Sequence, residues 1–307
     1  MNKELLSLEL KSRPKNFDEF YGNNALKIGL KKAIESRKKR SFLFYGPSGC
    51  GKTTLARICA NFINAEINEV NAADKGKKDD GRRINFESEY KAFDGRDAAY
   101  IIDEPQESSS GFQETLLKTI EEPKSHAWFF LCTTDPQKIK KTLIKRCAGY
   151  NVRKFTEKES IKLLKSICKK ENKKVDIEIL KIIADVNEGA PREMVVALDK
   201  IIDIEDKKTQ IKLVESGIPS SKNPEIKELC RNLMNGDFEK TNKILNNLEF
   251  RYEAEGIRHG ILKYFNSCCR KSTDEKFLKI AKWFEENFYD SGYIGLRNAC
   301  YDACEEE

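Results

Sequence analysis

The sequence contains no hydrophobic run long enough to cross a membrane. Its longest apolar stretch, Ala127–Cys132, has the length of a buried strand, whereas a membrane-spanning helix needs about 18 or more apolar residues. The opening residues, MNKELLSLELKSRPK, also lack the apolar segment of a secretory signal. We therefore expect a soluble cytoplasmic protein without a membrane partner, which would be nuclear in a eukaryote and in the host cytoplasm for a phage.

Cysteines and histidines at the spacing of a metal site or a catalytic pair are missing as well. None of the 10 cysteines forms a CxxC pair, and the group Cys268, Cys269, Cys300 and Cys304 has poor spacing for zinc ligands. The 2 histidines are far apart and suggest no catalytic pair. We expect no zinc and mostly reduced, often buried thiols, as is usual inside cells.

Charge of one sign is not in large excess. The net charge is +6 over 307 residues, and lysines alternate with acidic residues along most predicted helices. Such a balance permits a polyanionic partner without requiring one. The length allows two or three domains, each with its own core.

The strongest positive signal is the stretch SFLFYGPSGCGKTT, residues 41–54. An apolar strand leads into a full match to the phosphate-binding pattern GxxxxGK[ST], which a helix then follows. Glycines let backbone N–H groups surround phosphate oxygens, and the helix start adds positive potential. The predicted phosphate-binding residues are Gly46, Pro47, Ser48, Gly49, Cys50, Gly51, Lys52, Thr53 and Thr54.

A second strand ends in two carboxylates, in the sequence DAAYIIDE at residues 97–104. Open α/β sheets bind ligands at the carboxyl ends of their strands. We therefore predict that Asp103 and Thr53 bind Mg²⁺ beside a nucleotide, and that Glu104 polarises the attacking water.

Five predicted strands alternate with helices, which indicates a doubly wound parallel α/β sheet. The strands are expected near residues 42–45, 67–71, 97–104, 128–134 and 150–155, and helices near 25–37, 52–64, 110–121 and 136–145. Helical periodicity dominates after Thr156, and GIPSSKN at residues 217–223 reads as a linker. The predicted domains are 1–155, 156–217 and 218–307.

With these motifs in hand, the chain resembles the ATPase subunits of sliding-clamp loaders, which are AAA+ proteins. The resemblance rests on RPKNFDEFYGN, GPSGCGKTT, NAAD, IIDE, TLLKTIEEP, TTDPQK, KRC and GAPRE. This family includes replication factor C small subunits, the bacterial gamma/tau subunit and the large-phage equivalent. It implies a P-loop domain, a helical lid and a helical collar.

The resemblance also implies roles for individual residues. Thr134 would be sensor 1, Arg192 sensor 2, and Arg146 an arginine finger acting in trans on a neighbouring subunit. The segment that holds adenine would include Lys11, Ser12, Arg13 and Tyr21. Asn71 would hold Glu104 inactive until DNA arrives, and the predicted contacts to the DNA backbone are Lys75, Lys77, Ser109, Ser110 and Gln113.

The sequence departs from the family pattern in three places. The finger motif reads Lys145-Arg146-Cys147, with lysine in place of serine, and the acidic box reads Asp103-Glu104-Pro105-Gln106. Neither change removes a required charge. The cysteine-rich zinc insert of bacterial gamma/tau subunits is absent, which favours the replication factor C or phage type.

The function implied is ATP-driven opening and loading of a ring-shaped sliding clamp onto primer–template DNA. Its cofactors would be ATP and Mg²⁺, and its partners the clamp, DNA and other loader subunits, in a pentamer. Two alternatives remain. One is a different AAA+ motor, such as a branch-migration helicase or a remodeller. The other is a scaffold subunit that does not hydrolyse ATP.

Overall fold

The computed structural model describes residues 7–215, 219 and 223–306. They belong to two compact units: Met1–Leu163 with Gly189–Val196, and Leu164–Glu188 with Ala197–Glu307. This division does not test the predicted three domains, which stay a prediction. The predicted linker, residues 217–223, lies outside the described residues except for Pro219 and Asn223.

A five-stranded parallel sheet forms the centre of the first unit, with the strand order β2-β3-β4-β1-β5. The predicted α/β fold class is therefore confirmed. The strands are β1 (Ser41–Tyr45), β2 (Glu66–Asn71), β3 (Ala98–Asp103), β4 (Ala127–Thr133) and β5 (Ala148–Asn151).

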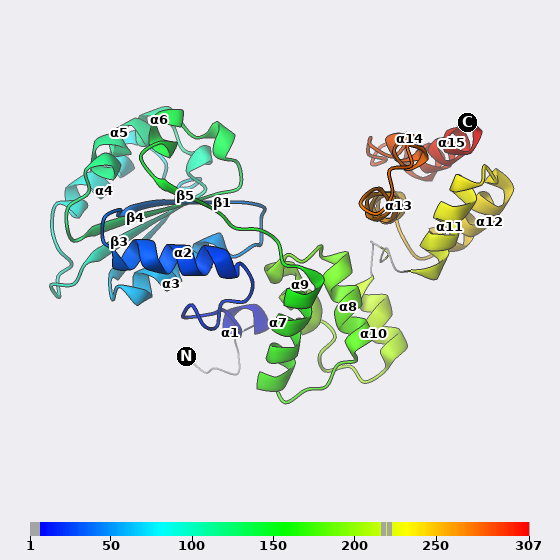
Figure 1. Cartoon of the computed structure of the whole chain (residues 1–307), viewed down its shortest axis with the longest axis horizontal. Helices are drawn as coiled ribbons and strands as arrows, with labels where there is room; N and C mark the ends of the chain where they lie inside the picture. The colour runs from blue at the N-terminus through cyan, green and yellow to red at the C-terminus, as the bar shows by residue number, and fades with distance from the viewer. Residues whose placement is uncertain (1–6, 216–218, 220–222, 307) are drawn as a thin grey trace. The chain divides into compact units, whose positions relative to one another are not determined.

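Helices cover both faces of this sheet (Figure 1). Alternate side chains of a strand point to opposite faces, so Phe42 and Phe44 of β1 join one core and Leu43 joins the other. Helices α2 (Asn24–Glu35) and α3 (Lys52–Phe62) pack on the first face. The second face is covered by α4 (Lys78–Ser88), α5 (Ser110–Glu121) and α6 (Lys141–Ile144).

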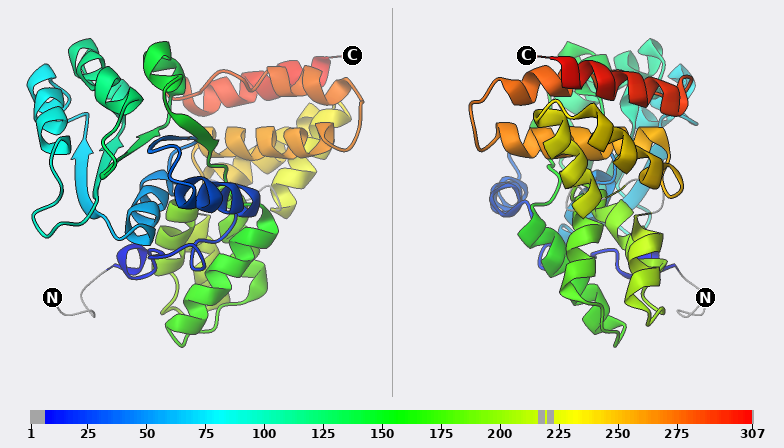
Figure 2. Two further views of the ribbon diagram at one scale, coloured as in Figure 1. Left: turned by 60° about the vertical axis from the view of Figure 1, so that its left-hand side comes forward. Right: turned by 90° about the vertical axis from the view of Figure 1, so that its right-hand side faces the viewer.

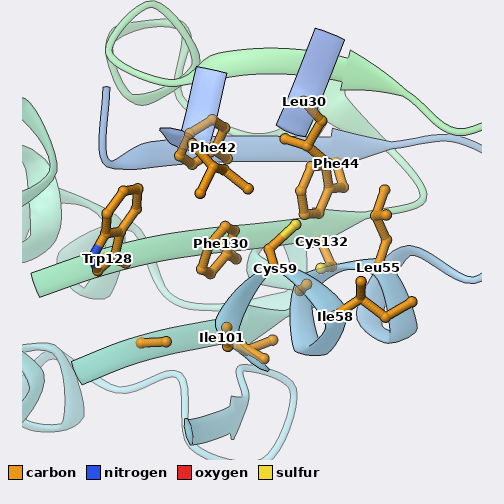
Figure 3. Close-up of a cluster of buried hydrophobic side chains, with 14 of the residues drawn as sticks. Leu30, Phe42, Phe44, Leu55, Ile58, Cys59, Ile101, Trp128, Phe130 and Cys132 are labelled. Carbon is orange, nitrogen blue, oxygen red and sulfur yellow. The ribbon is translucent and has the colours of Figure 1, made fainter. Parts of the chain in front are cut away.

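Aromatic residues of adjacent strands fill the core beneath α2 and α3, as Figure 3 shows. The ring of Phe42 stacks on Phe130, with centroids 5.5 Å apart, and also on Trp128 at 6.4 Å. All three side chains are fully buried. This packing fixes the strands whose carboxyl ends carry the candidate site.

Two predicted elements differ from the structure. The fifth strand ends at Asn151 rather than near Phe155, because its register with β1 runs out where Tyr45 pairs with Asn151. The single helix predicted over residues 136–145 is instead a 3₁₀ turn, η3 (Pro136–Lys138), followed by α6. Ile139 between them is extended and buried, so its side chain fills the core at the expense of helix continuity.

A short capping motif fixes the exit of the chain from the sheet. Helix α7 (Glu157–Lys170) starts after Thr156, whose N–H donates to Glu159 (2.9 Å). Glu159 also pairs in a bidentate manner with Arg153, both distances being 2.8 Å. These bonds lower the pKa of Glu159 to about 2, with the Arg153 guanidinium as the largest cause.

The remaining elements are helical. They are α1 (Leu8–Lys11), the 3₁₀ turn η2 (Pro105–Glu107), α8 (Ile177–Val186), α9 (Pro191–Asp199), α10 (Lys207–Val214), α11 (Pro224–Met234), α12 (Phe238–Glu249), α13 (Ala254–Cys269), α14 (Lys276–Lys282) and α15 (Gly292–Glu305). Helices α11 to α15 share one apolar core, and both views of Figure 2 show them side by side in yellow to red. Within the described ranges, none of the helices combines the length and apolarity that a membrane span requires.

We predict that Phe130→Ala destabilises the protein by about 3–5 kcal/mol, because it leaves a cavity among stacked rings. Ile28→Ala, on the exposed surface of α2 (61% exposed), is the matched control and should cost less than about 1 kcal/mol. Urea unfolding measures both. Equal losses for the two variants would contradict the assigned core.

We predict that Glu159→Gln costs about 2 kcal/mol of stability at pH 7. The folded-state pKa of Glu159 lies below its ordinary value, so its stabilisation is complete above about pH 4.5 and is lost as the pH falls towards 2. The stability gap between wild type and variant should therefore close over that range in urea unfolding. A gap that stays constant from pH 7 to pH 3 would refute the assignment.

Candidate functional site

The loop between β1 and α3 has the backbone shape that phosphate binding requires. Gly46, Gly49 and Gly51 have φ angles of 149°, 70° and 91°, which other residues adopt rarely. A Cβ atom on Gly46 would also lie 2.1 Å from the carbonyl oxygen of Val152. Glycine is therefore needed at the first position for space as well as for conformation.

Lys52 is the first residue of α3 and is only 6% exposed. Its ammonium donates to the carbonyl oxygens of Gly46 and Pro47, both at 2.9 Å. The charge thus lies against the loop at the positive end of a helix, where an anion would be attracted both by the lysine and by free N–H groups.

Thr53 and Asp103 meet across the sheet, with the threonine hydroxyl donating to the carboxylate at 2.9 Å. Burial raises the pKa of Asp103, and neighbouring Glu104 contributes in the same direction. A nearby cation would offset the free-energy cost of burying the charged carboxylate. Because hydroxyl and carboxylate oxygens are the ligands that Mg²⁺ prefers, these two residues fit a magnesium site.

Glu104 follows directly and has a left-handed backbone, with φ 49° and ψ 51°. Its Oε2 atom accepts from the Thr134 hydroxyl (3.0 Å), from the Thr134 N–H (3.2 Å) and from the Gln106 amide. Gln106 also accepts a hydrogen bond from Thr133 (2.6 Å). The predicted base and the predicted sensor 1 are therefore bonded to each other.

One pocket of about 350 Å³ in the first unit collects most of these residues. The predicted nucleotide-binding and metal-binding residues in its lining are Ser12, Arg13, Tyr21, Ser48, Gly49, Cys50, Gly51, Lys52, Thr53, Thr54, Asp103, Glu104 and Arg192. Lys11, Gly46, Pro47 and Thr134 are not in that lining. Segments far apart in the sequence are thus brought to the carboxyl edge of the sheet.

Sequence reasoning found Asp103 and Glu104 but missed two other acidic residues of this pocket, Glu9 and Glu69. Glu9 accepts from Arg192 at 2.9 Å and lies 4.0 Å from Arg13, so it pairs with two predicted nucleotide-binding arginines. Glu69 forms a bidentate pair with Arg57, both bonds being 2.7 Å. The Glu9–Arg192 and Arg57–Glu69 pairs join separate segments, so no periodic pattern marks them, whereas Glu9 and Arg13 are only four residues apart. The one available signal was the presence of arginines near the phosphate loop, each of which needs an acidic partner.

Arg146 lies just after α6 and outside this pocket lining. Its guanidinium donates to Glu121 at the end of α5 (2.8 Å) and to the carbonyl oxygen of Thr142 (2.9 Å). The side chain is 28% exposed. The charge of the predicted arginine finger is therefore paired within its own chain.

The predicted DNA contacts fall into two adjoining segments. Lys75, Lys77, Ser109 and Ser110 are exposed at the starts of α4 and α5. Ser109 connects the segments, since its N–H and its hydroxyl both donate to the carbonyl oxygen of Gly76, at 3.0 and 2.9 Å.

Gln113 is a correction to the predicted DNA contacts. Its side chain is 4% exposed and is engaged at both ends, donating to the carbonyl oxygen of Pro105 (3.2 Å) and accepting from the N–H of Lys140 (2.9 Å). The side chain points from α5 into the protein interior, where it joins η2 to the start of α6. It is therefore not available to a DNA phosphate.

Asn71 ends β2, beside Asp103 in the register. Its amide donates to Asp74 (2.9 Å), and its oxygen accepts from the N–H of Ala73 (3.1 Å). These bonds form a turn after the strand. The partners of Glu104 in this structure are Thr134 and Gln106, so the switch role of Asn71 stays a prediction.

The cysteines are free thiols in the described part of the chain. Burial raises the pKa of Cys59, Cys132 and Cys230 well above the ordinary value, which favours the neutral thiol. Over the same residues, no group of three or more His, Cys, Asp or Glu side chains is arranged to hold a metal ion.

Comparison with solved structures shows the fold. The branch-migration motor RuvB of Thermotoga maritima matches with a TM-score of 0.58 and 23% identity, over 73% of this chain and 79% of that one. A point mutant of the same motor gives equal values. The two chains thus share a fold.

Sequence comparisons point to DNA replication proteins. The family model described as DNA polymerase III, delta subunit matches residues 70–156. The chain is 30% identical to DNA polymerase III subunit gamma of Buchnera aphidicola (Schizaphis graminum) over 81% of its own length and 75% of that protein. It is 29% identical to subunit tau of Escherichia coli, over 64% of this chain and 34% of that longer protein.

These relatives carry bacterial gamma and tau names, so they do not support the preference for a replication factor C or phage type that the missing zinc insert suggested. Motifs, fold and relatives otherwise agree. The chain belongs to the family of DNA polymerase III gamma/tau subunits, which are clamp-loader subunits of the AAA+ ATPase type.

Proposed function

We propose that this protein is an active ATPase subunit that opens a ring-shaped sliding clamp and loads it onto primer–template DNA, hydrolysing ATP when both are bound. The observation that carries the proposal is the convergence of Lys52, Thr53, Asp103 and Glu104 on one pocket at the carboxyl edge of the sheet. A scaffold subunit would have no need of this complete set.

ATP phosphates would lie in the loop formed by residues 46–53, with Lys52 turning from the loop carbonyls to the β- and γ-phosphates. Thr53 and Asp103 would hold Mg²⁺, which supplies charge neutralisation at the phosphates when bound. Glu104 would orient and polarise the attacking water, and Thr134 would contact the γ-phosphate region.

The base of the nucleotide would lie near Ser12, Arg13 and Tyr21, with Lys11 beside them. Arg192 would act as sensor 2 from the start of α9. Its ion pair with Glu9 (2.9 Å) supports this arrangement, because a phosphate can replace the carboxylate as the partner of the guanidinium.

Arg146 would complete the active site of an adjacent subunit. A positive charge supplied in trans stabilises the charge of the transition state and is worth about 10³–10⁵ in rate. In a single chain this charge is paired with Glu121 (2.8 Å), so assembly would exchange one anionic partner for another. Hydrolysis would then require an assembled ring or spiral.

DNA would be held through its phosphates by Lys75, Lys77, Ser109 and Ser110, at the starts of α4 and α5. Contacts of this kind depend strongly on salt and are largely blind to sequence. The helices of residues 156–217 would form the lid, and those of residues 218–307 the collar that joins subunits, in a pentamer.

A different AAA+ motor is the second candidate. The observation that favours it is the fold shared with a branch-migration motor. Such a motor would move along DNA or thread a substrate. A loader would do neither, so a strand-displacement assay separates the two functions.

We predict that ATP turnover by the assembled protein rises strongly, by about ten-fold or more, when primer–template DNA and the cognate clamp are added together. Blunt duplex DNA without clamp is the control. Turnover by isolated subunits that ignores both additions would contradict the proposal.

We predict that Arg146→Ala keeps ATP affinity within about two-fold and lowers turnover by about 10³-fold or more. Mixing it with Lys52→Ala subunits, whose fingers are intact, should restore part of the activity. Lys145→Ala, the exposed neighbouring residue, is the matched control and should retain turnover. Failure of the mixture to recover any activity would refute a shared site.

A further inference from the structure

Gln106 has no role among the residues assigned above, yet it lies at the centre of the Glu104 contacts. It belongs to η2, the turn that begins directly after Glu104. Its amide nitrogen donates to Glu104 Oε2 and lies 3.2 Å from the Thr134 hydroxyl. Its amide oxygen accepts from Thr133 at 2.6 Å.

The orientation of this amide is fixed by its neighbours. The Thr133 oxygen accepts from the N–H of Asp135 at 3.0 Å, so its own hydrogen is directed to the Gln106 oxygen. The nitrogen of Gln106 is therefore the end that faces Glu104. Thr133 is fully buried at the end of β4, which makes this anchor rigid.

These contacts occupy one carboxylate oxygen of Glu104 and the hydroxyl of Thr134. Three donors converge on Glu104 Oε2, and the hydroxyl and N–H of Thr134 are two of them. A base that acts on water must offer it a free lone pair, and a sensor must offer its hydroxyl to the nucleotide. Here Oε2 of Glu104 and the hydroxyl of Thr134 are bonded to each other, so neither of these two atoms is offered to water or to the nucleotide.

The turn that carries Gln106 runs directly into the predicted DNA contacts. Ser108 donates from its N–H (3.2 Å) and its hydroxyl (2.6 Å) to the carbonyl oxygen of Pro105. Ser109 is bonded to Gly76, where an added Cβ would lie 2.8 Å from the Cβ of Ser108. A phosphate drawn between these two segments would press on the turn.

We propose that Gln106, anchored by Thr133, is the positioning residue that holds Glu104 in a resting place for as long as the turn formed by Pro105–Ser109 stays where it is. The proposal rests on the proposed function and names the regulation of that site. The positive φ of Glu104 (49°) suits such a device, because a strained backbone is readily displaced once its contacts are lost.

The test compares wild type with Gln106→Met and Thr133→Val, in the complete assembly. Both substitutions nearly keep side-chain volume and remove the hydrogen bonds from two different elements. Each should raise kcat without DNA by about two- to ten-fold, the worth of one or two hydrogen bonds. KM for ATP and the DNA-stimulated kcat should not change, so the stimulation ratio falls.

Gln137→Ala, an exposed glutamine in η3, is the matched control and should leave both rates unchanged. Adding Glu104→Gln to Gln106→Met must remove the gain. An unchanged or lower DNA-independent kcat in Gln106→Met would overturn the proposal; if that variant does not fold, the same result in Thr133→Val overturns it. A wild type that DNA fails to stimulate would instead defeat the proposed function, while the rise in the variants would still report on Gln106.

Discussion

The hydrogen bond between Thr53 and Asp103 (2.9 Å) joins the start of α3 to the end of β3, and the rest of the site is arranged around it. It can form because all five strands are parallel, so that their carboxyl ends lie at one edge. Strand β4 separates β1 from β3 and places Thr133 and Thr134 between the phosphate loop and Glu104. Strand order thus determines which polar residues meet.

Local patterns predicted the parts of the site that depend on few neighbours. The phosphate loop follows from its glycines, and the strands follow from apolar residues that alternate between two cores. Gln113 was placed wrongly because sequence shows only that it lies near a helix start, whereas its burial depends on Pro105 and Lys140. The break at Ile139 likewise reflects packing in the core rather than helix propensity.

Three groups with predicted catalytic roles have partners within the chain. Arg146 is bonded to Glu121, Arg192 to Glu9, and Glu104 to Thr134. Two of these are ion pairs, and each can be exchanged for a phosphate or a water in a nucleotide complex. In the single chain, these three groups are therefore engaged with partners other than a nucleotide. These contacts are what the proposed function expects, in which hydrolysis depends on assembly and on DNA.

The most direct measurement is a structure of the assembled particle with a non-hydrolysable ATP analogue and primer–template DNA. The account predicts that the guanidinium of Arg146 leaves Glu121 and lies within hydrogen-bond distance of the γ-phosphate bound to the adjacent subunit. A nucleotide-filled particle in which Arg146 stays on Glu121 at every subunit boundary would contradict it.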